Sequence, residues 1–262
     1  MNLLKPLLQI SNFIALISMI LMNMLVSTRS IDGNTVGSVS DKYDTLFSPA
    51  SYTFGIWGLI YLSLLGFVIY QGRDIFSKSK EQVPLLLKIT GWFGLSCAAN
   101  IVWLVAWLTE RLGLALMMMA ALLGSLLIIY IHLGIGNKRP RNPWERWLLH
   151  VPFSLYLGWI SIAIIANVAS YLVSIEWNGW GISFEVWTLF MIGLATILCM
   201  FMIMGRGDRI FGAVGIWALW GIGIKHLRMG IGESQLLMTT AVVCALLLVS
   251  SMFFRQIKAS FA

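Results

Sequence analysis

The chain has 262 residues, of which 59% are hydrophobic and 11% charged, and its mean hydropathy is +0.85. Soluble domains have about 45–50% apolar and about 25% charged residues, so the composition excludes a soluble globular protein and indicates that lipid is the solvent. The net charge of +7 does not indicate nucleic acid, because the basic residues lie between apolar runs and form no basic stripe interleaved with aromatic residues. We therefore expect an all-α integral membrane protein whose partner is the lipid bilayer, with no nucleic-acid partner.

Apolar runs long enough to cross the bilayer, roughly 20 residues each, predict eight transmembrane helices. In chain order they cover about residues 7–27, 52–71, 86–108, 112–134, 149–173, 184–204, 209–226 and 235–254. The first run follows Lys5, as a signal peptide would follow a basic residue. Its apolar stretch is long, however, and Ser27-Thr28-Arg29 lacks the small-x-small pattern of a cleavage site. We interpret it as a retained helix.

Lysine and arginine are distributed unequally between the two sides that eight spans would create. Thirteen of the 18 fall on the side of both termini: Lys5, Arg73, Lys78, Lys80, Lys88, Lys138, Arg139, Arg141, Arg146, Arg206, Arg209, Arg255 and Lys258. The other five are Arg29, Lys42, Arg111, Lys225 and Arg228. Because positive residues concentrate in cytoplasmic loops, we expect both termini to be cytoplasmic, in a bacterial inner membrane or plasma membrane.

The sequence contains few groups that could support catalysis. No predicted span carries Asp, Glu, Lys or Arg near its centre, which argues against a proton-coupled pump or a transporter of charged substrates. No nucleophile motif, P-loop or metal-ligand spacing is present. His132, His150 and His226 lie near helix ends and are interpreted as satisfied polar groups. These absences favour binding or transport over catalysis, and we predict no catalytic or metal site.

Three predicted spans each present a stripe of aromatic or amide side chains on one helical face. The stripes are Phe54, Trp57 and Tyr61 in the second span, Asn100, Trp103 and Trp107 in the third, and Tyr156, Trp159, Ala163 and Asn167 in the fifth. An amide in lipid needs a hydrogen-bond partner, so we expect Asn100 and Asn167 to point into the bundle. Two interpretations stay open. The stripes could be interhelical packing and hydrogen bonding, or they could wall a pocket for a flat apolar ligand.

The same residues resemble motifs of the tryptophan-rich sensory proteins, the bacterial relatives of the translocator protein or peripheral benzodiazepine receptor. Residues 48–61 resemble that family's proline-loop-to-second-helix pattern, 99–103 its Asn-x-x-Trp, and 156–167 its Tyr-x-x-Trp-x-x-x-Ala-x-x-x-Asn. The resemblance covers about residues 7–174. It implies a five-helix bundle whose pocket is capped by the first loop and binds tetrapyrroles, such as porphyrin or haem, or sterol- and isoprenoid-like lipids. The ligand-binding residues would be Pro49, Phe54, Trp57, Tyr61, Asn100, Trp103, Trp107, Tyr156, Trp159 and Asn167.

The resemblance divides the chain into a five-helix core, residues 1–174, and a three-helix membrane extension, residues 175–262. Glycines in the seventh span would let neighbouring backbones approach closely; they are Gly212, Gly215, Gly221 and Gly223. We interpret the extension as a packing addition or an oligomer surface, with a homodimer as the assembly considered. The function expected is that of a membrane receptor or carrier for a hydrophobic small molecule. The alternatives are a transporter of a small neutral molecule and an accessory or structural subunit of a larger membrane complex.

Overall fold

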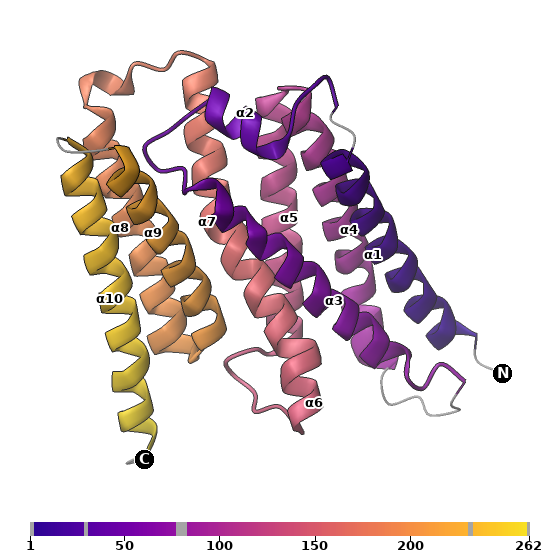
Figure 1. The fold of residues 1–262 in the computed structure, drawn as a ribbon. Coiled ribbons are helices and arrows are strands. Elements are labelled where there is room, and N and C mark those ends of the chain that lie inside the picture. The colour runs from indigo at the N-terminus through magenta and orange to yellow at the C-terminus, as the bar shows by residue number, and fades with distance from the viewer. Residues whose placement is uncertain (1–2, 29–30, 77–82, 230–232, 261–262) are drawn as a thin grey trace. The chain divides into compact units, whose positions relative to one another are not determined.

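The computed structural model describes residues 3–28, 31–76, 83–229 and 233–260, and this part of the chain is helical without a β-strand (Figure 1). The elements are α1 (Leu4–Thr28), α2 (Val36–Lys42), η1 (Ser51–Gly55), α3 (Ile56–Gly72), α4 (Val83–Leu108), α5 (Leu112–Leu133), α6 (Pro143–Glu145), η2 (Arg146–His150), α7 (Val151–Ser174), η3 (Gly179–Gly181), α8 (Phe184–Phe201), η4 (Met202–Arg206), α9 (Arg209–Met229) and α10 (Glu233–Ser260). Within the described residues, eight helical segments are long and apolar enough to cross a membrane. The predicted all-α, eight-span membrane protein is confirmed.

Helix ends coincide with recognisable local signals. The fifth span begins at Pro143, where the Asn142 side chain accepts a hydrogen bond from the Glu145 amide at 2.9 Å, an N-cap with proline in the first turn. Helix α5 ends at Leu133 and is capped by Gly134, whose φ of 67° is the left-handed conformation that glycine adopts without strain. Single π-helical segments, η2 and η4, join α6 to α7 and extend α8.

The described chain packs as two compact units. Unit 1 comprises Met1–Val39 and Trp57–Leu157, and unit 2 comprises Ser40–Ile56 and Gly158–Ala262. The boundary predicted at residue 174 came from a sequence resemblance rather than from packing, and it stays a prediction. Arg29, Lys78 and Lys80, which contribute to the predicted orientation, lie outside the described residues.

Unit 1 is built around α4, which packs against α1 and α5 (Figure 1). Three phenylalanines from three helices meet in its core: Phe67 of α3, Phe93 of α4 and Phe153 of α7 are fully buried. Their ring centroids lie 5.0 to 6.0 Å apart with edge-to-face geometry, the arrangement that aromatic quadrupoles favour. This cluster holds α3, α4 and the start of α7 together.

Helix α1 carries a buried polar stripe that faces α3 and α4. Lys5 Nζ lies 2.6 Å from Asp74 Oδ2, and the Gln9 amide donates to the Gln71 carbonyl oxygen. Less than one turn after Gln9, Asn12 Nδ2 donates to Gln71 Oε1 at 2.8 Å. Positions 5, 9 and 12 follow the helical period, so one face of α1 supplies polar partners inside the unit. The stripe was not predicted.

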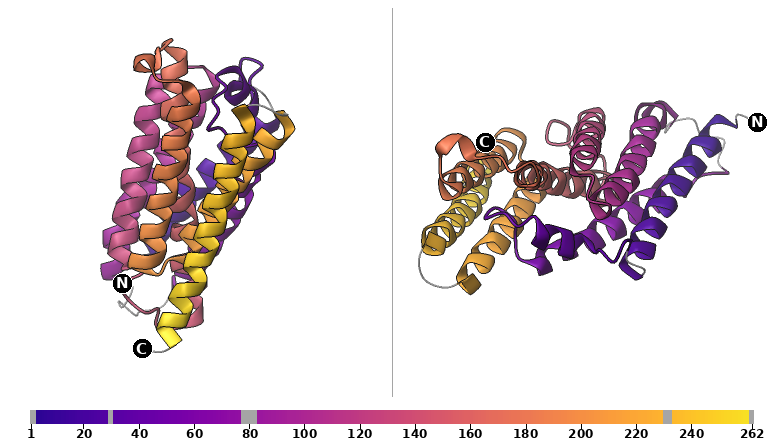
Figure 2. Two further views of the ribbon diagram at one scale, coloured as in Figure 1. Left: turned by 90° about the vertical axis from the view of Figure 1, so that its left-hand side faces the viewer. Right: turned by 90° about the horizontal axis from the view of Figure 1, so that it is seen from above.

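Unit 2 contains α8, α9 and α10, which lie side by side in both views of Figure 2. The glycines of α9 face side chains of the same chain: a Cβ on Gly212 would lie 2.6 Å from Ile203, and one on Gly215 would overlap Cys199. Helix backbones in this unit therefore approach more closely than larger residues allow. These contacts favour the packing interpretation of the C-terminal glycines, and the homodimer stays a prediction.

Candidate functional site

Four of the predicted ligand-binding side chains form one stacked series in unit 1, called here the aromatic column. In order along the column they are Tyr61, Trp57, Trp103 and Trp107. Successive ring centroids lie 5.6, 5.9 and 6.1 Å apart, and the interplanar angles are 27°, 29° and 27°. The column joins α3 to α4, because the aromatic stripe of one helix continues onto that of the other. The helical spacing used in the prediction thus produces a continuous aromatic surface.

Asn100 lies beside the column and connects three helices. Its Oδ1 accepts from Asn23 Nδ2 of α1 at 3.0 Å, and its Nδ2 donates to the hydroxyl of Tyr156 of α7 at 3.1 Å. The Tyr156 ring in turn meets Trp57 edge-on, with centroids 5.9 Å apart. Asn100 and Tyr156 are fully buried, as expected for an amide in lipid. Asn100 therefore positions the tyrosine that flanks the column.

The end of the column holds the first loop to α4. The indole nitrogen of Trp107 donates to the Val36 carbonyl oxygen at 3.2 Å, and Asn34 Nδ2 donates to the Leu108 carbonyl oxygen at 2.9 Å. A tryptophan predicted to contact ligand thus also anchors residues 34–36 of the loop.

Exposure differs along the column. Trp103 and Trp107 are each 5% exposed, whereas Trp57 and Tyr61 are half-buried. Rings that already stack on one another leave no gap between them for a planar guest. Trp57 is stacked between Tyr61 and Trp103, so a flat ligand has access only to the outer face of Tyr61 and to the edges of the Trp57 and Tyr61 rings.

The other four predicted residues belong to unit 2. Phe54 and Trp159 meet edge-to-face, with ring centroids 6.0 Å apart. Pro49 lies against Gly221 of α9. Asn167 is buried, and its Nδ2 donates to the Ala163 carbonyl oxygen at 3.0 Å. The structure thus brings together Trp57, Tyr61, Asn100, Trp103, Trp107 and Tyr156 in one unit. The ligand contacts of the whole set stay a prediction.

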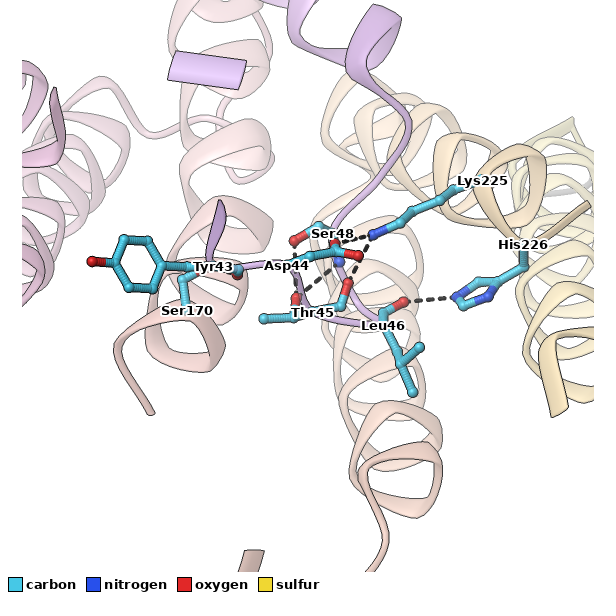
Figure 3. A network of polar contacts seen from close by, with 8 residues as sticks. All are labelled: Tyr43, Asp44, Thr45, Leu46, Ser48, Ser170, Lys225 and His226. Atoms are coloured by element: carbon cyan, nitrogen blue, oxygen red, sulfur yellow. Dashed lines mark hydrogen bonds and ion pairs between the residues drawn. The ribbon is translucent and has the colours of Figure 1, made fainter. Parts of the chain in front are cut away.

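The first loop is also bound to α9 within unit 2, by a network that was not predicted (Figure 3). Lys225 Nζ pairs with the Asp44 carboxylate and donates to the Thr45 carbonyl oxygen at 2.9 Å. The next residue, His226, lies with its Nε2 2.8 Å from the Leu46 carbonyl oxygen. Two adjacent side chains at the end of α9 therefore hold three consecutive loop residues, 44–46.

A second set of contacts attaches the turn η1 to α9. The Ala50 amide donates to the Gly221 carbonyl oxygen at 3.0 Å, and the Trp217 indole donates to the Thr53 carbonyl oxygen at the same distance. A Cβ on Gly221 would overlap the Thr53 side chain. Glycine at this position is therefore required for the close approach of loop and helix.

A large apolar groove of about 950 Å³ runs along α7 and α8 in unit 2, beside loop residues 44–46. Most of its lining is aliphatic or aromatic, and it ends at the connection between the two helices, where carboxylates and tryptophans gather. No sequence motif singled it out, because its walls come from two helices and a loop that are distant in sequence.

Among the described residues, no group of three or more His, Cys, Asp and Glu side chains is placed to hold a metal ion. His132 Nδ1 lies 3.0 Å from the Lys88 carbonyl oxygen, and His226 binds the loop. Both histidines thus have the polar partners expected of structural side chains.

Two groups of functional residues were missed by sequence reasoning. Asn23 lies at the fourteenth position after Gln9, on the buried face of α1, and the period of that stripe could have identified it. Asp44, Lys225 and His226 offered no comparable signal, because the loop and the end of α9 that they join are about 180 residues apart in sequence.

A comparison with family models matched one described as TSPO-like protein, over residues 9–254. The match continues through the eighth span, well past residue 174, where the motif resemblance ended. Searches of curated proteins and of solved structures returned no match.

Proposed function

The chain belongs to the TSPO-like protein family, and from this premise we propose that it binds a flat hydrophobic ligand on the aromatic column of unit 1. A multi-pass membrane protein of this family has a membrane-associated role in ligand binding or transport. The finer proposal is a receptor or carrier whose ligand is a tetrapyrrole or a sterol- or isoprenoid-like lipid. We propose no cofactor, and a porphyrin or haem would be a ligand.

The aromatic column carries the proposal. Stacking on an aromatic face favours planar, apolar guests over flexible ones, because a rigid ring system loses little conformational entropy on binding. Tyr61 supplies the accessible face and Trp57 an accessible edge, while Trp57 supports Tyr61 from behind and Trp103 supports Trp57 in turn. Asn100 acts as a positioning residue, since its amide nitrogen and oxygen are already bonded to Tyr156 and Asn23.

An absorbance titration with protoporphyrin IX in neutral detergent tests the proposal. Wild type is compared with the double variant Trp57→Phe, Trp103→Phe, which keeps the apolar core but shortens the stacking surface. Aromatic pairs contribute about 0.5–1.5 kcal/mol each, so we expect the dissociation constant to rise about tenfold. Trp144→Phe is the matched control, because Trp144 is 67% exposed on α6 of the same unit. Equal affinity in the double variant and the control would contradict the proposal.

Competition separates the two ligand classes. Cholesterol added to the protoporphyrin complex should displace it if both occupy the column, and should leave the absorbance unchanged if the site prefers tetrapyrroles. Ligand movement across proteoliposomes then distinguishes a carrier from a receptor.

We also propose that both termini are cytoplasmic, on the basis of the lysine and arginine distribution. The ion pair of buried Lys5 with half-buried Asp74 supports part of this proposal, because it joins the start of α1 to the segment after α3 and so favours one membrane side for both. A green fluorescent protein fused to the C-terminus should fluoresce, and alkaline phosphatase at the same position should be inactive. The opposite result would reverse the orientation.

A further inference from the structure

The groove along α7 and α8 has the dimensions of one lipid chain in one leaflet. On α7 its lining extends from Ile165 to Val173, and on α8 from Phe184 to Leu194. Glu176 and Trp177 line it beyond the end of α7. At 1.5 Å per residue, the helical stretches are roughly 12 Å long on α7 and roughly 15 Å long on α8. The hydrocarbon core of a bilayer is about 30 Å thick, so the groove covers about half of it.

Apolar side chains remain uncovered along this length. Val168 and Val173 of α7 and Phe190 and Leu194 of α8 are exposed, and Leu194 is 47% exposed. A concave apolar surface is filled by a flexible chain at little steric cost. An alkyl chain therefore matches the body of the groove better than a rigid planar ring.

Three tryptophans mark the end of the groove. Trp177, Trp180 and Trp187 form a cluster at the α7–α8 connection, with ring centroids 5.3 to 6.0 Å apart. The Trp187 indole donates to the Gly179 carbonyl oxygen at 3.0 Å. Tryptophans concentrate at the depth of the lipid head groups, so the cluster places this end of the groove at the membrane surface.

The charge at that end is negative. Asp44, Glu176 and Glu185 line it, and the described lining contains no lysine or arginine. Lys225 pairs with Asp44 from outside the lining, and Glu176 and Glu185 lie with the tryptophans at this end. Carboxylates and aromatic faces both attract an ammonium group.

We propose that the groove binds a membrane lipid with an ammonium-ended head group, of the choline or ethanolamine type. One acyl chain lies along α7 and α8, and the ammonium lies among the carboxylates and tryptophans at the surface. The site is independent of the aromatic column, since all of its lining residues belong to unit 2.

Native mass spectrometry of the full chain in detergent tests this proposal with two probes, phosphatidylcholine and phosphatidylglycerol with identical acyl chains. Both carry a phosphate, so a difference between them isolates the ammonium group. We expect wild type to bind phosphatidylcholine at least tenfold more tightly. Equal binding of the two lipids would overturn the proposal.

Two pairs of variants locate the site. Leu172→Trp with Leu194→Trp fills the groove and should weaken phosphatidylcholine binding at least tenfold. Ile197→Trp, on α8 and 67% exposed but outside the lining, should not. Binding by the filled variant that equals binding by Ile197→Trp would also overturn the proposal.

Glu176→Gln with Glu185→Gln keeps the apolar body and should bring the two lipid affinities within twofold of each other. Asp41→Asn, at an exposed position outside the groove, should retain the preference. If the filled variant fails to fold, this pair decides the question alone: an unchanged preference in the glutamine variant contradicts the assigned head-group site.

Discussion

The helices of the two units associate within the membrane by different interactions. In unit 1, polar side chains lie inside the spans and bond across helices, as Asn12 does with Gln71 and Asn23 with Asn100. In unit 2, helices approach through glycines such as Gly215, and the hydrogen bonds described between the loop and α9 lie in the second half of that helix, as at Lys225. Lipid provides no hydrophobic force between helices, so close packing and hydrogen bonds are the two sources of association. Each unit relies mainly on one of them.

This difference has a functional consequence. Directional hydrogen bonds fix the rotation of a helix about its axis, which keeps the rings of the aromatic column in register in unit 1. Glycine packing fixes the distance between the helices of unit 2, where α7 and α8 line an apolar groove. The comparison predicts that polar substitutions damage unit 1 most and that size substitutions damage unit 2 most.

The largest effect on stability is expected for Asn100→Leu. The change removes the hydrogen bonds that Asn100 makes with Asn23 and with Tyr156, which then keep only their contacts with Met19, for a loss of about 2 kcal/mol in the free energy of unfolding. Denaturation in mixed detergent micelles measures it. Asn137→Ala, at an exposed position of the same unit, is the control and should change stability by less than about 0.5 kcal/mol. Equal effects in the two variants would show that the amide network does not stabilise unit 1.

Gly215→Ala is expected to have an intermediate effect. Its new methyl group would overlap the Cys199 sulfur, and overpacking of this kind costs about 1–3 kcal/mol. The better helix propensity of alanine offsets about 1 kcal/mol of that. Gly193→Ala, on α8 with no atom near the added methyl group, should be neutral or stabilising. Stabilisation by both substitutions would refute close glycine packing as the principle of unit 2.

The smallest effect is expected for Lys225→Met. The Asp44 side chain is 45% exposed, and exposed ion pairs contribute about 0–1 kcal/mol. The loop keeps its Ala50–Gly221 bond and its His226–Leu46 contact. Thermal unfolding should therefore show a small decrease, and limited proteolysis should show faster cleavage near residue 44 than in wild type. A large destabilisation would mean that this pair, rather than the glycines, holds unit 2 together.

The features that the sequence predicted correctly are those that depend on the spacing of residues along a single helix. Periodicity placed eight spans within a few residues and put Trp57 and Tyr61 on one face, because both depend only on local helical geometry. It did not pair Asp44 with Lys225 or form the groove, since these depend on how distant segments meet. The buried stripe at Lys5, Gln9 and Asn12 was detectable by the same period, but the apolar residues around it concealed it.

The central claim is that the aromatic column of unit 1 is the site for a flat hydrophobic ligand. Protoporphyrin IX and phosphatidylcholine binding, each measured on the Trp57→Phe, Trp103→Phe variant and on the Leu172→Trp, Leu194→Trp variant, tests it most directly. We predict that the column variant loses about tenfold in porphyrin affinity and keeps its lipid binding, and that the groove variant does the reverse. Porphyrin binding that survives the column substitutions and is lost with the groove substitutions would contradict the account.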